Sequence, residues 1–174
     1  MENAIFARTS VREFTDQKVD ASKIKPLLKA AMQAPSAGNQ QPWEFYVVSD
    51  RDVLAKLGQA GKYSEPAGKA PVVIVVCNRN RGMHYPEFVP QDMAACVQNM
   101  LLEAVNQSLG AVWLGVAPRE GRMEIVRNIM NLPANLDPFA LVAVGYAAEE
   151  QQAEKRYDES RVRGLKDFDF AKLA

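Results

Sequence analysis

The sequence predicts a domain of the α/β or α+β class in which helices cover a central sheet. Its 174 residues are enough for a hydrophobic core, and 48% apolar against 24% charged residues is an ordinary globular composition. Segments typical of helices alternate with short runs rich in β-branched residues. The chain has neither the GxGxxG turn nor the GxxxxGKS/T loop of nucleotide-binding folds, so a doubly wound fold is not expected.

Apolar periodicity and capping residues together predict four helices. They are Ser22–Gln33, Ser49–Ala60, Pro90–Ser108 and Arg119–Met130. Asp20 or Ser22 is expected to cap the first helix, and Gly110 is expected to be the C-cap of the third. The third helix is the longest and has a broad apolar face, which predicts a central position.

Short apolar or aromatic runs predict the strands. They are Glu44–Ser49, Pro71–Cys77, Ala111–Val116 and Phe139–Tyr146. After Ala147 the chain is charged, and Phe168, Phe170 and Leu173 then have the spacing of a short edge strand. Because this tail has little core of its own, we expect it either to fray or to dock on another subunit.

Charge and composition exclude several classes of protein. Lysine plus arginine equals aspartate plus glutamate, so there is no positive excess for a nucleic-acid or membrane partner. The sequence shows neither a secretory signal nor a run of ~18 apolar residues that could span a membrane. Cys77 and Cys96 are expected to be buried thiols. Together these observations predict a cytoplasmic protein. The single histidine, His84, excludes multi-histidine metal sites, and we expect no metal. His84 is either a surface loop residue or part of a substrate pocket.

The first candidate site is the N-terminal sequence R-T-S-V-R. If this segment is extended after a short first helix, Arg8, Ser10 and Arg12 lie on one face, because strand side chains alternate. Two guanidinium groups and a hydroxyl suit a phosphate monoester, which carries nearly two negative charges. The alternative is that both arginines are solvated and pair with Glu13 or Asp16 on the surface.

The second candidate site is the uncharged segment Ala34–Trp43. Its small residues, two prolines and a glycine predict a defined turn. The side-chain amides of Asn39, Gln40 and Gln41 can donate and accept hydrogen bonds. A flavin needs such partners, because its pyrimidine edge has both acceptors and a donor. The alternative is a structural loop whose amides satisfy the local backbone.

Two further segments could complete such a site. In Trp113–Pro118, Gly115 would let a flat ring approach the backbone, so that an N–H could face the flavin N5. The polar tail Tyr157–Arg163 carries arginines that could complete a phosphate site. The alternatives are a simple turn for the first segment and a solvated charged tail for the second.

The order and separation of these motifs resemble the FMN-dependent nitroreductase family over nearly the whole chain. R-T-S-V-R-E-F and A-P-S-A-G-N-Q-Q-P-W-E-F carry the resemblance, and Q-N-M-L-L-E-A, W-L-G-V-A-P, V-A-V-G-Y and a terminal S-R support it. The resemblance implies a single α+β domain over residues 1–174, sandwich-like, with a mixed, mostly antiparallel sheet flanked by helices. It also implies a homodimer with a long central helix at the interface and an exchanged C-terminal arm, about residues 150–174.

The resemblance further implies an FMN site at the interface of the homodimer. Four residues match positions that hold the phosphate and part of the ring edge: Arg8, Thr9, Ser10 and Arg12. Four match a loop from the other subunit that contacts the ring and the ribityl chain: Pro35, Ser36, Ala37 and Asn39. Leu114 and Gly115 match the segment whose backbone faces N5, and Arg161, or else Arg163, matches an arginine that closes the phosphate site.

The implied activity is reduction of FMN by NADH or NADPH, followed by reduction of a nitroaromatic, quinone or similar acceptor. The cofactor carries this chemistry, so no acid or base is expected; Arg12 or a backbone N–H would stabilise negative charge at the ring edge. Many larger members have an acidic residue in place of Leu114 and an inserted helix pair for which this chain has little room. The alternatives are dehydrogenation or dehalogenation of a specific metabolite, a flavin-binding module without turnover, or a protein without cofactor.

Overall fold

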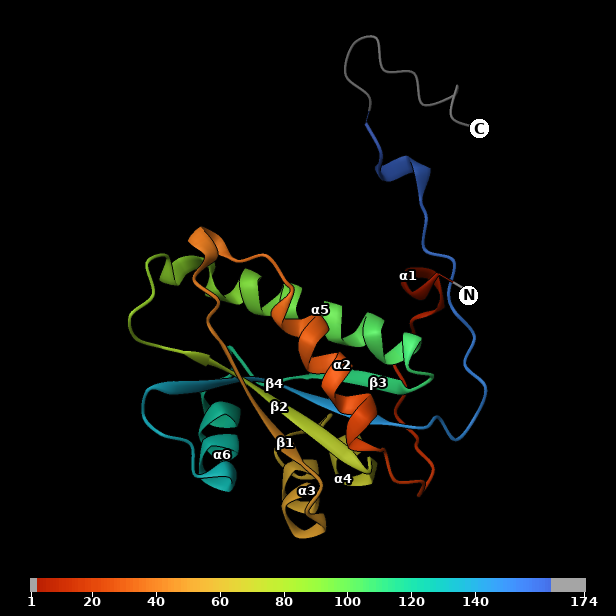
Figure 1. Cartoon of the computed structure of the whole chain (residues 1–174), viewed down its shortest axis with the longest axis horizontal. Helices are drawn as coiled ribbons and strands as arrows, with labels where there is room; N and C mark the ends of the chain where they lie inside the picture. The colour runs from red at the N-terminus through yellow and green to blue at the C-terminus, as the bar shows by residue number, and fades with distance from the viewer. Residues whose placement is uncertain (1–2, 164–174) are drawn as a thin grey trace.

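A computed structural model describes residues 3–163 of the chain. A four-stranded sheet lies between one layer formed by α2 and α5 and another formed by α3, α4 and α6 (Figure 1). The strands are β1 (Trp43–Val48), β2 (Val72–Arg79), β3 (Gly110–Gly115) and β4 (Leu136–Gly145). The α-helices are α1 (Ala4–Ala7), α2 (Ala21–Met32), α3 (Arg51–Gly58), α4 (Glu65–Lys69), α5 (Val89–Asn106) and α6 (Glu120–Met130). Three short 3₁₀ helices are η1 (Ala37–Asn39), η2 (Pro86–Phe88) and η3 (Glu159–Arg161).

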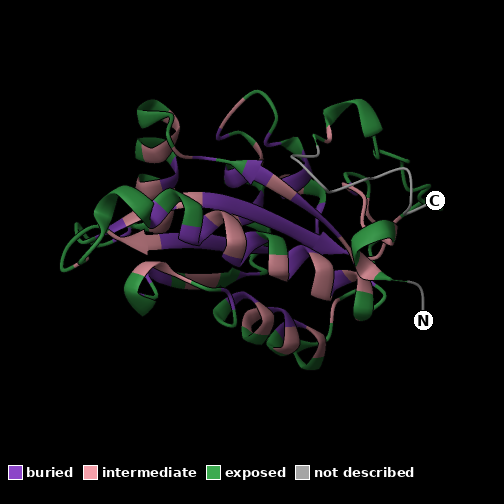
Figure 2. Ribbon diagram, turned by 90° about the horizontal axis from the view of Figure 1, so that it is seen from above, coloured by how far each residue is buried: buried purple, intermediate pink, exposed green. Residues whose placement is uncertain are grey.

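The sheet has the order β1-β2-β4-β3, and each neighbouring pair of strands is antiparallel. A parallel contact is added by the isolated bridge between Ser10 and Ala111 at the outer edge of β3. β2 is buried from Val72 to Cys77, as predicted for this run, because helices cover both faces of the sheet (Figure 2). The predicted α+β class with a mixed, mostly antiparallel sheet is confirmed.

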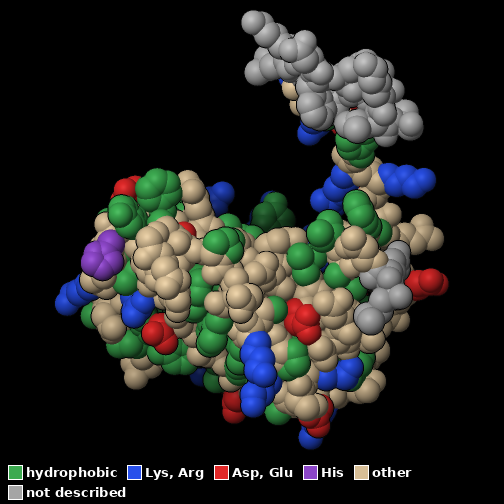
Figure 3. All heavy atoms as spheres, turned by 45° about the horizontal axis from the view of Figure 1, so that its top comes forward, with side chains coloured by type: hydrophobic (Ala, Val, Ile, Leu, Met, Phe, Trp, Pro, Cys, Tyr) green, Lys and Arg blue, Asp and Glu red, His purple; other side chains and the backbone are tan. Residues whose placement is uncertain are grey.

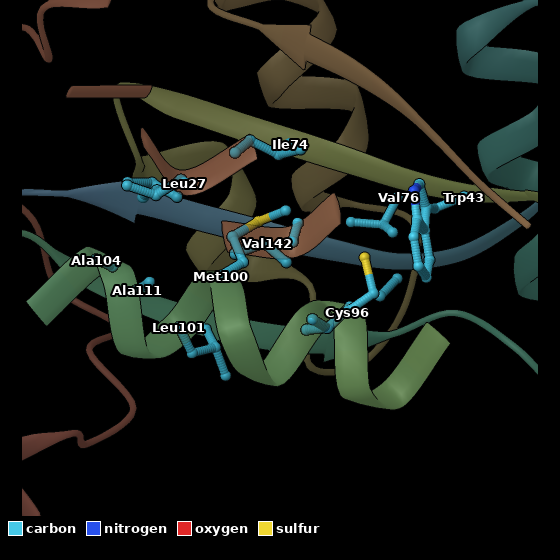
Figure 4. Close-up of a cluster of buried hydrophobic side chains, with 14 of the residues drawn as sticks. Leu27, Trp43, Ile74, Val76, Cys96, Met100, Leu101, Ala104, Ala111 and Val142 are labelled. Carbon is cyan, nitrogen blue, oxygen red and sulfur yellow. The ribbon is translucent and has the colours of Figure 1, made fainter. Parts of the chain in front are cut away.

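The core has two parts, one on each face of the sheet. On one face α5 buries Met93, Cys96 and Met100 against Leu27 of α2 and strand residues such as Ile74 (Figure 4). The other face packs against the apolar sides of α3, α4 and α6. Since every fully buried leucine or isoleucine removes roughly 1.5–3 kcal/mol of unfavourable contact with water, both parts stabilise the sheet.

The two cysteines lie on opposite faces of the sheet and are both free, as expected. Burial raises the pKa of the Cys77 thiol and that of the Cys96 thiol to about 12 each. The thiolate, which is the reactive form, is therefore strongly disfavoured in both cysteines. We expect native protein to leave a thiol-specific reagent unreacted, and both thiols per chain to react after unfolding in denaturant. Rapid modification of a thiol in the native protein would contradict this burial.

Two features differ from the expected elements. α4 was not anticipated, because the sequence E-P-A-G-K has no amphipathic pattern. The helix packs so closely on α3 that a Cβ on Gly58 would lie 2.9 Å from the Cα of Gly68. Gly110 as the C-cap of α5 is wrong. The helix ends at Asn106 and Ser108 adopts the left-handed conformation (φ 57°), whereas Gly110 is the first residue of β3.

The chain beyond β4 is first held by the N-terminal segment and then leaves the body. The backbone N–H of Thr15 donates to the carbonyl of Tyr146 (2.9 Å), and that of Ala148 donates to the carbonyl of Glu13 (3.1 Å). From residue 148 the described chain is almost entirely exposed, and the part bearing η3 projects past α1 (Figure 1). The edge strand expected at Phe168–Leu173 lies outside the described residues.

In residues 3–163 no helix is long and apolar enough to cross a membrane.

Candidate functional site

The N-terminal segment is extended, which is the condition on which the first candidate site depends, and it lies along the outer edge of β3. After α1, Arg8 has φ −62° and ψ 125°. The backbone N–H of Val11 then donates to the carbonyl of Ala111 (3.1 Å). Gly110 permits this approach, because a Cβ at that position would lie 2.7 Å from the Val11 side chain. The glycine expected to end a helix instead lets the N-terminal segment pack on the sheet.

The extended conformation places the two arginines on one face. Thr9 and Val11 line a hollow against the C-terminal part of α5. Arg8, Ser10 and Arg12 therefore project from the opposite side of the segment. By this alternation the three side chains lie on the side of the segment away from the Thr9 side chain, which leaves Thr9 its backbone as the group on the arginine side. Arg12 also lines a hollow beside α4.

The surface ion pairs considered as an alternative for these arginines are absent from the described chain. Glu13 pairs instead with Lys69, with 2.8 Å between Oε1 and Nζ. Among residues 3–163, neither Arg8 nor Arg12 lies within ion-pair distance of a carboxylate. Arg12 donates one hydrogen bond to the carbonyl of Ser10 (3.2 Å). In residues 3–163, neither guanidinium group is therefore neutralised by a carboxylate.

The second segment forms a rigid loop that contains η1. Gly38, Asn39 and Gln41 all have positive φ, at 54°, 55° and 45°. Local side chains hold this shape: the Ser36 hydroxyl accepts from the N–H of Gln41 (3.0 Å), and the Asn39 carbonyl accepts from the Gln41 amide (2.8 Å). The side-chain amides thus satisfy local groups, as expected for a purely structural loop. Pro35 and Asn39 nevertheless remain exposed on the outer side of the loop.

A buried carboxylate anchors the loop to the first turn of α5. Asp92 is 5% exposed, and its two oxygens accept from the N–H of Ala37 (2.9 Å) and the amide of Gln40 (2.7 Å). Burial of an unpaired charge is unfavourable, and these charge-assisted hydrogen bonds and the helix dipole offset that cost. This role of Asp92 has no local signal in the sequence, because its partners lie more than 50 positions away.

We expect Asp92→Asn to lower the melting temperature by about 3–10 °C, because an asparagine cannot accept from both donors and a buried unmet donor costs ~1–3 kcal/mol. Thermal unfolding followed by circular dichroism measures this change. Asp52→Asn is the matched control, since Asp52 occupies the first turn of α3 but is exposed. Equal melting temperatures for the two variants would show that the anchor adds no stability.

At the end of β3 the backbone of Gly115 is exposed and has free space beside it. Leu114 is 7% exposed and packs in the core on the α3 side of the sheet, so its side chain cannot reach a ligand. A Cβ on Gly115 would meet nothing within 4 Å, and the φ of Gly115 is not positive. No neighbour in the described chain therefore requires glycine there. A flat ring lying against the backbone would require it.

The predicted groups are brought together only in part. The loop lies at the N-terminal end of α5 and the arginine segment at its C-terminal end, and α5 has 18 residues, or about 27 Å at ~1.5 Å per residue. Arg161 lies in the projecting arm, 84% exposed and paired with Asp158 (2.9 Å). Arg163 donates to the backbone carbonyls of Ser160 and Val162.

The residues at the edge of β3 fit FMN. The arginine face lies beside Ala111, and Gly115 lies four residues further along the strand, about 13 Å at ~3.3 Å per residue. An elongated ligand with a dianionic phosphate at one end and a flat ring at the other matches this separation. The described residues contain no group of three or more metal-ligating side chains.

A helix-covered antiparallel sheet with an arginine-bearing segment on the edge of β3 defines an α+β protein of the nitroreductase type. The chain belongs to the nitroreductase family: the model described as "Nitroreductase family" matches residues 5–62 and 59–146. A relative from Archaeoglobus fulgidus, named as a candidate NADH dehydrogenase/NAD(P)H nitroreductase, is 40% identical over 162 residues, 91% of this chain and 93% of the relative.

Solved structures show the same fold. A candidate NADH oxidase of Clostridium acetobutylicum is 43% identical with a TM-score of 0.90, over 95% of this chain and 99% of that one. A candidate nitroreductase of Desulfovibrio desulfuricans, solved in complex with FMN, is 30% identical with a TM-score of 0.80, over 93% and 94% of the two chains. The family resemblance recognised in the sequence motifs is confirmed.

Proposed function

We propose that the protein is an FMN-dependent NAD(P)H oxidoreductase that reduces a nitroaromatic, quinone or similar electron acceptor. The observation that carries this proposal is the pair Arg8 and Arg12, which flank Ser10 on one face with no carboxylate partner in the described chain. The FMN named with one relative and the NAD(P)H named with another support it.

The chain's own residues bind and orient the cofactor. Arg8, Ser10 and Arg12 would hold the phosphate and part of the ring edge, where Arg12 would stabilise negative charge. The backbone at Leu114 and Gly115 supports the ring near N5. Bound FMN would supply hydride-transfer chemistry, with NADH or NADPH as the reductant and the electron acceptor as the oxidant. No side chain is assigned as a general acid or base.

We propose that the site is completed in a homodimer. The loop bearing Pro35, Ser36, Ala37 and Asn39 lies at the far end of α5 from the arginines, so one chain cannot offer both to the same FMN. Exposed apolar side chains on α1, Ile5 at 63% and Phe6 at 72%, also favour a partner surface. Arg161, or Arg163, on the arm from about residue 150 would close the partner's phosphate site.

We further propose that residues 1–174 form one domain with this arm as its extension. The free thiols of Cys77 and Cys96 support a reducing, cytoplasmic compartment. We propose neither a nucleic-acid nor a membrane partner.

The test is an absorption spectrum of the purified full-length protein before and after anaerobic addition of NADH, and separately of NADPH. We expect flavin bands that bleach with at least one of the two nucleotides. Bands that persist with both would favour a flavin-binding module. Absence of flavin bands even after incubation with FMN would overturn the proposal.

A further inference from the structure

A third arginine without a carboxylate partner lies at the end of β3. On the face shown in Figure 3, lysine and arginine side chains are scattered among acidic ones, so charge alone marks no site there. Arg122, in α6, stands out by its contacts: it is half-buried and donates from Nη1 to the backbone carbonyl of Gly115. In residues 3–163, no carboxylate lies within ion-pair distance of Arg122.

A second contact fixes the other side of the Arg122 guanidinium group. Gly61 lies between α3 and α4, and a Cβ on it would be 2.5 Å from the Nε atom of Arg122 and 2.7 Å from Nη2. Because the φ of Gly61 is not positive, it is the arginine and not the backbone conformation that requires glycine there. The next residue, Lys62, lines the hollow that Arg12 also lines. Arg122 therefore joins the end of β3 to the loop beside Arg12.

The hydrogen-bond pattern of β3 shows what Gly115 offers at the outer edge of the sheet. The N–H of Val116 donates to the carbonyl of Phe139 in β4 (3.1 Å), and the carbonyl of Ala111 accepts from the N-terminal segment. Since the backbone groups of successive residues in a strand point to opposite edges, the N–H and the carbonyl of Gly115 both point away from β4. Arg122 engages the carbonyl, which leaves the N–H facing outward.

On the basis of the proposed function, the backbone of Gly115 faces N5 of the FMN ring. We propose that Arg122 is a positioning residue that acts through Gly115 and tunes the reduction potential of the flavin. By holding the carbonyl, it presents only the N–H of Gly115 to N5; a carbonyl turned toward N5 would repel it, because both are acceptors. The same guanidinium group places a positive charge behind this end of the ring, where it would favour the electron-rich reduced form.

The contact is tested first in the FMN-free protein. Gly115 is the only glycine followed by valine in the sequence, so labelling glycine carbonyls with ¹³C and valine nitrogens with ¹⁵N gives one correlated NMR signal for this peptide group. We expect Arg122→Gln to shift the signal by removing the guanidinium group, and Gly61→Ala to shift it by displacing that group. A signal that stays in place in both variants would overturn the proposal.

The matched control is Arg127→Gln. Arg127 lies on the same helix and also donates to a backbone carbonyl, that of Pro133 (3.1 Å), but it pairs with Asp137 (2.6 Å) and does not contact Gly115. This variant should leave both the NMR signal and the flavin potential as in wild type. Thermal unfolding of each FMN-free variant measures any loss of stability separately.

The reduction potential of the bound flavin is then measured anaerobically against a reference dye. For Arg122→Gln we expect the equilibrium constant for two-electron reduction to fall about tenfold, which is a potential roughly 30 mV more negative. Arg122→Lys should stay within about twofold of wild type, because the charge is kept. Gly61→Ala should shift the potential in the same direction as Arg122→Gln although the chain keeps all its charges, and it remains decisive if Arg122→Gln does not fold.

Two results would overturn the role of Arg122 in proteins that bind FMN. One is an unchanged potential in both Arg122→Gln and Gly61→Ala, and the other is an equal shift in Arg127→Gln. Failure of wild type to bind FMN would instead overturn the proposed function, while the NMR signal would still report the contact between Arg122 and Gly115.

Discussion

Replacing both arginines of the N-terminal segment, Arg8→Ala with Arg12→Ala, is expected to raise the Kd for FMN at least about a hundredfold. Each charge-assisted hydrogen bond to a phosphate contributes ~1.5–3 kcal/mol, and every 1.4 kcal/mol is a factor of ten in affinity. The measurement is quenching of FMN fluorescence by the cofactor-free protein. Raising the salt concentration should weaken FMN binding to wild type more than to the variant.

The matched control removes two exposed lysines from helices of the same chain, Lys25→Ala with Lys56→Ala. It should bind FMN like wild type at a given salt concentration. Arg12→Ala alone should also shift the flavin reduction potential, because the proposed function assigns this cation to the ring edge. If Arg12→Ala leaves both affinity and potential unchanged, the role assigned to Arg12 is wrong.

Gly115→Val is expected to abolish measurable FMN binding without unfolding the protein. A Cβ at Gly115 meets nothing within 4 Å, so the chain itself accommodates a branched side chain at the end of β3. The same side chain would fill the space that a flat ring needs, and binding should weaken by at least about a hundredfold, since such a clash costs several kcal/mol. Calorimetric titration with FMN and thermal unfolding without FMN measure the two effects.

Gly121→Val is the control for this substitution. Gly121 lies in α6, is exposed, and also has nothing within 4 Å of its Cβ position. We expect this variant to bind FMN normally. Tight binding by Gly115→Val would show that the ring does not approach this strand end.

Elements with a local signal were predicted closely. α2 begins with the predicted cap, Asp20, and α5 occupies the predicted central helix to within two residues at each end. These elements follow from apolar periodicity, which is a property of neighbouring residues. The role of Gly110 was predicted wrongly because the sequence around it is typical of a helix end. Glycine is needed at this position because Val11, nearly a hundred positions away, packs against it.

The candidate site divides in the same way. The shared face of Arg8, Ser10 and Arg12 was predictable, since alternation along an extended segment is local. The anchoring of the loop by Asp92 was not, because it arises from a tertiary contact between distant segments. The separation of the arginines from the loop likewise depends on how the chain folds back around α5.

The position of α5 between the arginine segment and the η1 loop has a consequence for how this sequence can vary in length. Inserting one residue into the helix would lengthen it by ~1.5 Å and rotate everything beyond it by about 100°. In the proposed homodimer, both ends would lose register with the partner copy at once. The segment before α5 and the exposed arm can change length without this penalty, so α5 acts as a spacer of fixed size between regions that are free to diverge.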